Sequence, residues 1–316
     1  MIEKKWTCIQ PLRTSWTAPN ISTPWSNNPF HNDSKLLRAN AYHIDSIDIE
    51  MDSDVYLLIS YDIGNLEKEI KLVKELKSKG AKIVIGFSFD LRFLIGDGLL
   101  SPSGTLYTAL CKEVDIILSG VSDNYKCYGR YQDKVFPLGM FLERLNLSTV
   151  SYENRNIDLL ISSSMGEECF GFTMETLLTI KEKYPDKRIV YSISELSIEK
   201  YKHFQNEIEF SNKKLLDLMP YAKVYYNPEM RPRSGRAIQE AWYCRTPFIS
   251  HSWVYFSKIF PEFTYTGMDM QTIASNFGLI LNSNYDEIIK RGEKNIEEDY
   301  FDKLYPRLMK RLFPDE

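Results

Sequence analysis

The stretch Asn227 to Ser250, NPEMRPRSGRAIQEAWYCRTPFIS, decides how the rest of the sequence is interpreted. It begins at the end of an apolar run and continues through a basic turn that contains Gly235. Apolar residues then recur at helical spacing from residue 234 to 244, and Glu240 falls away from that apolar face. The sequence therefore predicts a strand, a basic turn, a short helix carrying one carboxylate, and a second strand.

Length and composition favour an ordinary soluble protein with two domains. The 316 residues suffice for two domains of about 100 to 200 residues each. Hydrophobic residues make up 43% and charged residues 26%, which argues against disorder. A formal net charge of -4, with no long basic run, argues against a general nucleic-acid binder.

Membrane segments and metal sites are not expected. No stretch approaches the roughly 18 consecutive apolar residues of a membrane span, and the start MIEKKWTCIQ has no apolar signal-peptide core. We therefore expect a cytoplasmic protein without a transmembrane segment. The five cysteines and four histidines are scattered without metal-ligand spacing, so we expect no metal and buried free thiols.

Short apolar runs alternate with amphipathic segments in the first half of the chain. Residues 1–50 form an irregular segment rich in Trp, Asn, Ser and Pro. Strands are predicted at VYLLISY (55–61), AKIVIGFSFD (81–90), VDIILSG (114–120) and KVFPLGMF (134–141), and helices at 65–79 and 103–112. This alternation predicts a parallel α/β sheet.

The alternation starts again in the second half, so a second domain is predicted after residue 150. Its predicted strands are IDLLISSS (157–164), RIVYSIS (188–194), AKVYYNP (222–228) and TPFISHS (246–252), and its predicted helices are 172–183, 211–219 and 234–244. The charged tail at 285–313 is predicted to be helical, with an apolar face that needs a partner.

Three segments of the second half stand in an order that resembles the retaining GT-B glycosyltransferases of the glycosyl transferases group 1 family. They are KYPDKRIVY (183–191), YAKVYYNP (221–228) and AIQEAWYCRTPFI (237–249). Weaker similarities, such as VIGFSFDL (84–91), extend the resemblance over roughly residues 55–280.

The resemblance implies a GT-B fold with two Rossmann-like domains whose parallel sheets face each other across a cleft. It implies an acceptor domain at 1–150 and a nucleotide-sugar donor domain at 151–284. Helices at 285–316 are then expected to cross back and pack on the N-terminal domain, which would cover their apolar face.

Glu240 is the first donor-binding candidate. The resemblance implies that this carboxylate accepts hydrogen bonds from the ribose hydroxyls of the donor. The alternative is a solvated helix face on which Glu240 pairs with Arg236. Pro232 stands where the family has a sugar-binding glutamate, so Glu229 is our candidate for that catalytic role.

The start of the same helix is a candidate phosphate site. Ser234 and Gly235 open the helix, where backbone N–H groups and the helix dipole favour an anion. Arg231, Arg233 and Arg236 surround them, although a solvated basic loop is the alternative. Further donor-binding candidates at predicted strand ends are Ser163, Ser164, Gly166 and Ser192.

The first domain supplies the remaining candidates. Asp90 ends a predicted strand and is a candidate catalytic residue that orients the acceptor or acts as a base, with a strand-end cap as the alternative. It follows Phe89, where the family has a histidine. Asp62 and Asn65, in the turn after the first strand, are acceptor-binding candidates. Trp16 is another, unless it only fixes its loop to the core.

The sequence thus favours a glycosyltransferase that moves a sugar from a UDP- or GDP-linked donor to a hydroxyl acceptor, with retention and without metal or cofactor. The acceptor stays open between a glycan, a small molecule and a hydroxylated DNA base, and an inverting mechanism stays open too. The main alternative is a non-catalytic GT-B-like protein that binds a nucleotide or sugar phosphate. A sugar-phosphate epimerase is a third possibility.

Overall fold

The computed structural model describes residues 4–10, 39–44, 52–59, 66–87, 102–119, 129–138, 142–162, 170–193, 198–229 and 236–316. These residues form two compact units. Unit 1 contains the described residues of Met1–Glu143 together with Asp299–Glu316. Unit 2 contains the described residues of Arg144–Arg231 and of Gly235–Glu298. The domain boundaries at residues 150 and 284 stay predictions from the sequence.

Unit 1 is built on a parallel sheet that has six strands in the described part of the chain, in the order β2-β1-β3-β4-β5-β6. These strands are β1 (Trp6–Gln10), β2 (Asn40–His43), β3 (Val55–Ile59), β4 (Lys82–Phe87), β5 (Ile116–Ser119) and β6 (Val135–Pro137). Strands buried on both faces are continuous apolar runs, as in Val55–Ile59. The order places β1 between β2 and β3, next to the edge strand of the described sheet.

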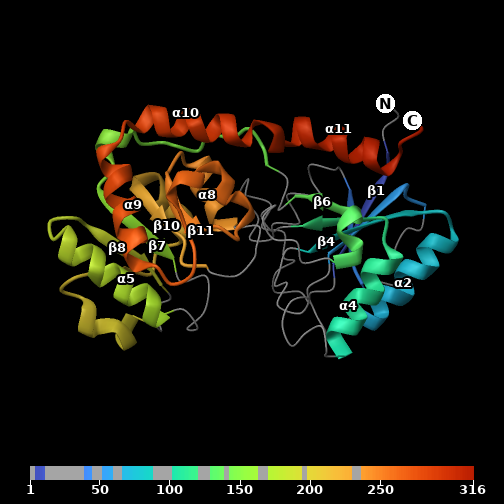
Figure 1. Ribbon diagram of the computed structural model, residues 1–316, viewed down its shortest axis with the longest axis horizontal. Coiled ribbons are helices and arrows are strands. Elements are labelled where there is room, and N and C mark those ends of the chain that lie inside the picture. The colour runs from blue at the N-terminus through green and yellow to red at the C-terminus, as the bar shows by residue number, and fades with distance from the viewer. Residues whose placement is uncertain are drawn as a thin grey trace. The chain divides into compact units, whose positions relative to one another are not determined.

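Helices cover both faces of this sheet (Figure 1). On one face, α2 (Leu66–Ser78) and α4 (Pro102–Glu113) enclose a core that includes Ile9 of β1. On the other face, α11 (Phe301–Leu312) buries Leu308 in a core that includes Trp6. The Trp6 side chain also donates a hydrogen bond of 3.3 Å to the Tyr305 hydroxyl. Successive side chains of β1 point to opposite faces of the sheet, so this one strand contributes to the cores on both faces.

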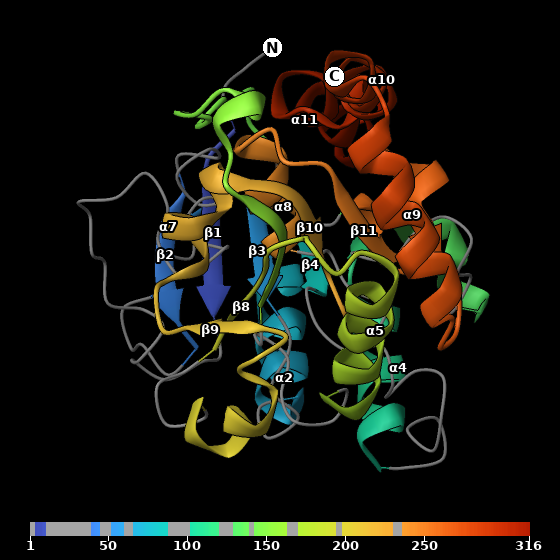
Figure 2. The same ribbon diagram turned by 90° about the vertical axis from the view of Figure 1, so that its left-hand side faces the viewer.

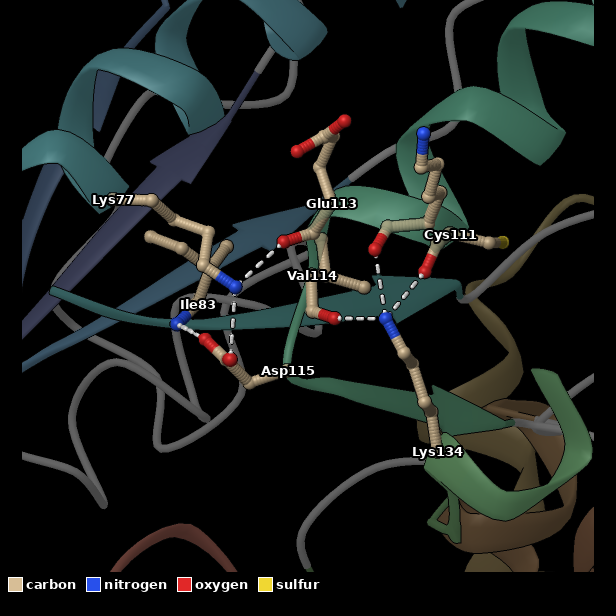
Figure 3. Close-up of polar contacts among 8 residues, drawn as sticks. Lys77, Ile83, Cys111, Glu113, Val114, Asp115 and Lys134 are labelled. Atoms are coloured by element: carbon tan, nitrogen blue, oxygen red, sulfur yellow. Dashed lines mark hydrogen bonds and ion pairs between the residues drawn. The ribbon is translucent and has the colours of Figure 1, made fainter.

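Two lysines fix the C-terminal end of α4 (Figure 3). Lys134 Nζ donates to the carbonyl oxygens of Cys111, Lys112 and Val114 at 3.2, 2.8 and 2.7 Å. Lys77 Nζ donates to the Glu113 carbonyl and to Asp115 Oδ1, both at 2.9 Å, while Asp115 Oδ2 accepts from the Ile83 N–H at 2.8 Å. The last carbonyls of a helix lack intrahelical partners, so these cations stabilise α4 beside the strand amino ends.

Unit 2 has a second parallel sheet, with six described strands in the order β12-β11-β10-β7-β8-β9. They are β7 (Ile157–Ser162), β8 (Ile189–Ser192), β9 (Glu209–Ser211), β10 (Ala222–Tyr226), β11 (Phe248–His251) and β12 (Thr264–Tyr265). The helices α5 (Phe170–Lys183) and α9 (Met270–Asn282) lie side by side in unit 2 (Figure 2).

Two further helices of unit 2 pack around Phe260. Its ring lies 6.0 Å from Trp242 of α8 (Arg236–Tyr243) and 4.8 Å from Phe248 of β11. Gly292 of α10 (Tyr285–Ile296) packs so closely on this cluster that a Cβ there would lie 2.7 Å from Phe260 Cε1 and 2.8 Å from Trp242 Cζ3. A glycine is therefore required where α10 crosses the aromatic cluster.

A buried arginine holds the amino ends of β10 and β11 together. Arg155 is 2% exposed, and its Nη1 donates to the Ala222 carbonyl at 2.8 Å and to Thr246 Oγ1 at 3.0 Å. Its Nη2 donates to the Cys244 carbonyl at 3.0 Å and to the Tyr285 hydroxyl at 3.3 Å. Because the guanidinium presents several donors in one plane, it satisfies groups from three elements at once.

Most predicted elements are confirmed, with corrections at residues 1–50 and 211–219. Residues 1–50 contain β1 and β2, so this segment is not irregular throughout as predicted. The predicted helix at 211–219 is too long: Ser211 belongs to β9, and α7 covers only Leu215–Leu218. Pro220 has no N–H to continue the α-helical hydrogen bonds, and the chain goes on as a 3-10 turn at Met219–Tyr221. None of the helices described here combines the length and apolar character that a bilayer span requires.

Candidate functional site

Small polar residues line the carboxyl edge of the sheet of unit 2. Ser162 of β7 lies opposite Ser192 of β8, which lies opposite Ser211 of β9. Farther along the same edge, Ser250 of β11 lies opposite Thr264 of β12. We call these five residues the carboxyl-edge row. Ligands of open parallel sheets bind at the carboxyl ends of the strands, so this edge is the candidate site.

Two buried carboxylates belong to the same region. Glu229 follows the end of β10 by three residues and is 3% exposed, and Glu240 of α8 is 6% exposed. Carboxylates are almost never fully buried in proteins unless they are paired, which makes both side chains informative. The burial of Glu240 excludes the solvated helix face that the sequence left as an alternative.

Tyr225 connects this region to β7. Its side chain is fully buried, and its hydroxyl lies 2.9 Å from Ser162 Oγ, where either group can donate. Burial raises the pKa of Tyr225 far above its ordinary value, the bond with Ser162 opposes that rise, and the charges of Glu240 and Glu229 add to it. The tyrosine hydroxyl therefore stays protonated and has both carboxylates as electrostatic neighbours.

Ser250 differs from the other members of the carboxyl-edge row. It is 1% exposed, and its hydroxyl has no hydrogen-bond partner within the described part of the chain. An unsatisfied buried hydroxyl costs about 1–3 kcal/mol. By contrast, the Ser192 hydroxyl donates to the Lys213 carbonyl at 2.9 Å.

His251 is held between the ends of β11 and β12. Its Nδ1 lies 3.2 Å from the Trp253 N–H, and its Nε2 lies 3.1 Å from the Gly267 N–H. A neutral imidazole has one acceptor nitrogen, so it accepts from only one of these groups at a time. Burial lowers the pKa of His251, which favours this neutral form. The His251 side chain therefore holds the loop after β11 and the loop after β12.

Four of the predicted site residues lie in the described part of the chain. Ser192 ends β8 at the carboxyl edge, Glu229 follows the end of β10, Glu240 is a buried residue of α8, and Arg236 is the first residue of that helix. The other predicted site residues lie outside the described part: Trp16, Asp62, Asn65, Asp90, Ser163, Ser164, Gly166, Arg231, Arg233, Ser234 and Gly235. In the described ranges, no group of three or more His, Cys, Asp or Glu side chains is arranged to hold a metal ion.

Sequence reasoning missed Tyr225, Ser162 and Ser250. A signal was present, because each apolar strand of unit 2 that ends at the candidate site changes to a small polar residue at or just after its last position. Such a change at several strands of one parallel sheet indicates a ligand-binding edge.

No protein-family profile matches the chain, and no curated protein matches it either. Solved structures match its fold. HepE from Anabaena, in complex with UDP, is 10% identical with a TM-score of 0.66, and the match covers 96% of this chain and 98% of HepE. A UDP-forming alpha,alpha-trehalose-phosphate synthase from Burkholderia xenovorans is 11% identical with a TM-score of 0.58, over 84% of this chain and 74% of the synthase.

TarM from S. aureus, in a complex that contains UDP, gives a TM-score of 0.59 at 10% identity. That match covers 81% of this chain but 55% of TarM, so the chain spans about half the length of TarM. At these identities the likeness concerns the fold. Both units of the described chain have a parallel sheet with helices packed on it, which is the Rossmann-like architecture predicted from the sequence. The protein therefore has the two-domain α/β GT-B fold of these glycosyltransferases.

Proposed function

We propose that the protein is a glycosyltransferase that uses a UDP- or GDP-linked sugar as donor and a hydroxyl group as acceptor. The observation that carries the proposal is the buried carboxylate of Glu240 on α8 of unit 2, in a chain with the GT-B fold. The solved structures of HepE and TarM contain UDP, and the trehalose-phosphate synthase forms UDP, which supports a nucleotide-sugar donor.

Glu240 is proposed to hold the ribose of the donor. Its two oxygens accept hydrogen bonds from the 2′ and 3′ hydroxyls together, and charge-assisted bonds of this kind are stronger than neutral ones. A carboxylate buried before the ligand arrives has already lost its water, so little reorganisation is needed on binding. Ser192, at the end of β8, is proposed as a further donor contact.

The diphosphate of the donor is proposed to lie at the start of α8, the helix that begins at Arg236. Positive helix ends and fixed cations stabilise the negative charge that develops on a leaving nucleotide, so a metal is not part of this proposal. The phosphate-binding set is the one that the sequence predicts: Ser163, Ser164, Gly166, Arg231, Arg233, Ser234, Gly235 and Arg236.

Glu229 is proposed to contact the donor sugar, in place of the glutamate that Pro232 replaces. It follows a strand end and is buried, as a sugar-reading carboxylate must be to exclude water. Acceptor binding is proposed for Asp62, Asn65 and Trp16, with Asp90 orienting the acceptor hydroxyl. The acceptor is a glycan, a small molecule or a hydroxylated DNA base, and transfer is proposed to retain the anomeric configuration.

A panel of UDP- and GDP-sugars tests the donor proposal. We expect at least one of them to raise the melting temperature and to be hydrolysed slowly, as measured by thermal shift and mass spectrometry. Glu240→Gln should weaken nucleotide binding by about tenfold or more, because one strong acceptor becomes an amide. Glu175→Gln, at an exposed position of α5, is the matched control and should bind as the wild type does.

The proposal fails if no nucleotide sugar stabilises the protein, or if Glu240→Gln binds as tightly as the wild type. The anomer first released during slow hydrolysis, followed by NMR, tests retention. A product of inverted configuration would leave the donor site intact but overturn the retaining mechanism.

A non-catalytic nucleotide-binding protein is the second candidate. The observation that favours it is the presence of Pro232 and Phe89 at two positions where the family has a glutamate and a histidine. A protein that is stabilised by UDP-sugars but neither hydrolyses nor transfers them would support this candidate.

A further inference from the structure

Trp253 is an exposed tryptophan on a short loop whose backbone is held on both sides. It follows β11 by two residues and is 40% exposed. Its backbone nitrogen lies 3.2 Å from His251 Nδ1, and the Val254 N–H donates to the His251 carbonyl at 3.1 Å. The Ser252 N–H donates to the Tyr265 carbonyl of β12 at 2.9 Å. These bonds hold the loop, so the structure presents the indole to solvent from a fixed position.

A second exposed apolar side chain lies on the neighbouring loop. Met268 follows β12 and is 69% exposed. Gly267, the residue before it, has a φ of 60°, and its backbone nitrogen lies 3.1 Å from His251 Nε2. Asp269, the residue after it, caps α9 and accepts from the Thr272 N–H at 2.9 Å. One imidazole therefore lies between the backbones of the two loops, which leave the same part of the carboxyl edge.

A chain of contacts joins these loops to the segment that carries Glu229. The His251 ring lies 4.8 Å from the Trp253 ring and 5.2 Å from the Tyr265 ring. The Tyr265 hydroxyl donates to the Asn227 carbonyl at 3.2 Å, and Asn227 is two residues before Glu229. Strands β10 and β11 are paired, and paired strands lie about 4.8 Å apart. Trp253 and Glu229 thus belong to segments that leave adjacent strands at one edge of the sheet.

An aromatic ring and a carboxylate at one edge form a combination that suits a sugar. A pyranose ring has C–H groups on its faces and hydroxyl groups around its rim. An indole ring can cover the apolar face, while a carboxylate accepts hydrogen bonds from hydroxyls at the rim. Ligand sites generally combine aromatic surface with a few polar groups that fix the orientation of the ligand.

The position of Trp253 in the sheet favours the sugar of the donor over its nucleoside. Ser192, the proposed donor contact beside the ribose site, ends β8. Strands β10 and β7 separate β8 from β11, so Ser192 and Trp253 belong to opposite halves of the edge. In a nucleotide sugar the diphosphate separates the nucleoside from the sugar. The half of the edge that carries Trp253 is also the half next to Glu229, the proposed sugar contact.

We propose that Trp253, with Met268 on the neighbouring loop, forms an apolar platform on which the ring of the donor sugar packs while Glu229 binds its hydroxyls. The inference rests on the proposed glycosyltransferase function and adds a residue that determines affinity for the sugar and not for the nucleotide. Because the loop is held before the ligand arrives, packing a sugar on the indole costs little conformational freedom.

Titration calorimetry tests the platform with two ligands. One is the member of the UDP- and GDP-sugar panel that raises the melting temperature most, and the other is the matching UDP or GDP. Trp253→Ala should weaken binding of the nucleotide sugar by about fivefold or more and leave that of the nucleoside diphosphate within about twofold. Trp253→Phe keeps an aromatic face and should lose less, and Met268→Ala should weaken binding of the nucleotide sugar by about twofold.

Tyr221→Ala is the matched control. Tyr221 is also an exposed aromatic residue of unit 2, at 44%, but it directly precedes β10 at the opposite edge of the sheet. Its substitution should leave both dissociation constants unchanged. A loss of stability alone does not move the ratio of two dissociation constants measured on the same folded variant, so the ratio separates a sugar contact from a structural role.

Failure of the inference and failure of the proposed function give different results. If Trp253→Ala binds both ligands as the wild type does, or loses affinity for both equally, the sugar platform is overturned and the nucleotide site stands. If the wild type binds neither a nucleotide sugar nor a nucleoside diphosphate, the proposed function is overturned and this inference falls with it.

Discussion

Arg155 Nη1 donates a hydrogen bond of 3.0 Å to Oγ1 of Thr246, two residues before β11 begins. The same guanidinium group also donates to the Cys244 carbonyl just after α8 and to the Ala222 carbonyl at the start of β10. The helix that carries Glu240 is thus fixed at its far end by a side chain that lies outside the candidate site.

Arg155→Lys is expected to lower the free energy of unfolding by about 3 kcal/mol. A lysine keeps the charge but not the planar set of donors, so buried carbonyls and hydroxyls lose their partners. Arg188→Lys is the matched control, because its ion pair with Glu209 is exposed and should be worth less than about 1 kcal/mol. Chemical denaturation measures both variants, and equal losses would contradict the buried network.

Gly292→Ala is expected to destabilise the protein by about 1–3 kcal/mol, although alanine favours helices by about 1 kcal/mol. The new methyl group would lie closer than 3.0 Å to the buried rings of Phe260 and Trp242, so packed side chains would have to shift. Gly171→Ala in α5 is the control, since no atom of the described residues lies within 4 Å of a Cβ there. The control should be more stable than the wild type, and opposite thermal shifts for the two variants check the prediction.

The changes in stability caused by Ser250→Ala and by Ser162→Ala are expected to differ in sign, although both substitutions remove one hydroxyl from the carboxyl-edge row. Removing the Ser250 hydroxyl deletes a buried group without a partner in the described part of the chain, so the melting temperature of the ligand-free protein should stay or rise. Removing the Ser162 hydroxyl breaks its bond to Tyr225 and should cost about 1 kcal/mol or more. A clear loss of stability in Ser250→Ala would mean that its hydroxyl is satisfied.

His251 should make stability depend on pH. Burial lowers the pKa of the folded side chain below its ordinary value of 6.5, so the unfolded chain binds the proton more tightly. The free energy of unfolding should therefore fall as the pH drops through 6.5, by at most about 1.4 kcal/mol per pH unit from this group. His251→Gln should flatten the profile between about pH 7 and pH 5, as measured by urea denaturation. Parallel profiles for the two proteins would contradict the prediction.

The central strands of the fold were predictable, but the first strand was not. Strands such as Val55–Ile59 are buried on both faces and are therefore continuous apolar runs. In β1, the polar Thr7 interrupts the apolar run, and its hydroxyl is satisfied by Ser53 Oγ at 2.8 Å. That partner lies far along the sequence, so local patterns give no reason to place Thr7 in a core.

The candidate site was predictable only in part for the same reason. The segment from residue 227 to 250 made Glu240 a candidate because the predicted helix, its carboxylate and the next strand lie close together in the sequence. Tyr225 looks like any aromatic residue of a buried strand. Its hydroxyl bonds to Ser162 on a different strand, and that pairing exists only once β7 and β10 have formed.

The position of α11 also sets the order in which the chain can finish folding. Leu308 and Leu312 complete a core with Trp6 and Cys8, although nearly the whole chain separates them in sequence. During synthesis at about 5–20 residues per second, the strands of unit 1 leave the ribosome about 10 s or more before α11 does. Until then Trp6 and Cys8 lack the apolar side chains of α11 that bury them, so the nascent chain exposes an apolar surface of the kind that chaperones bind.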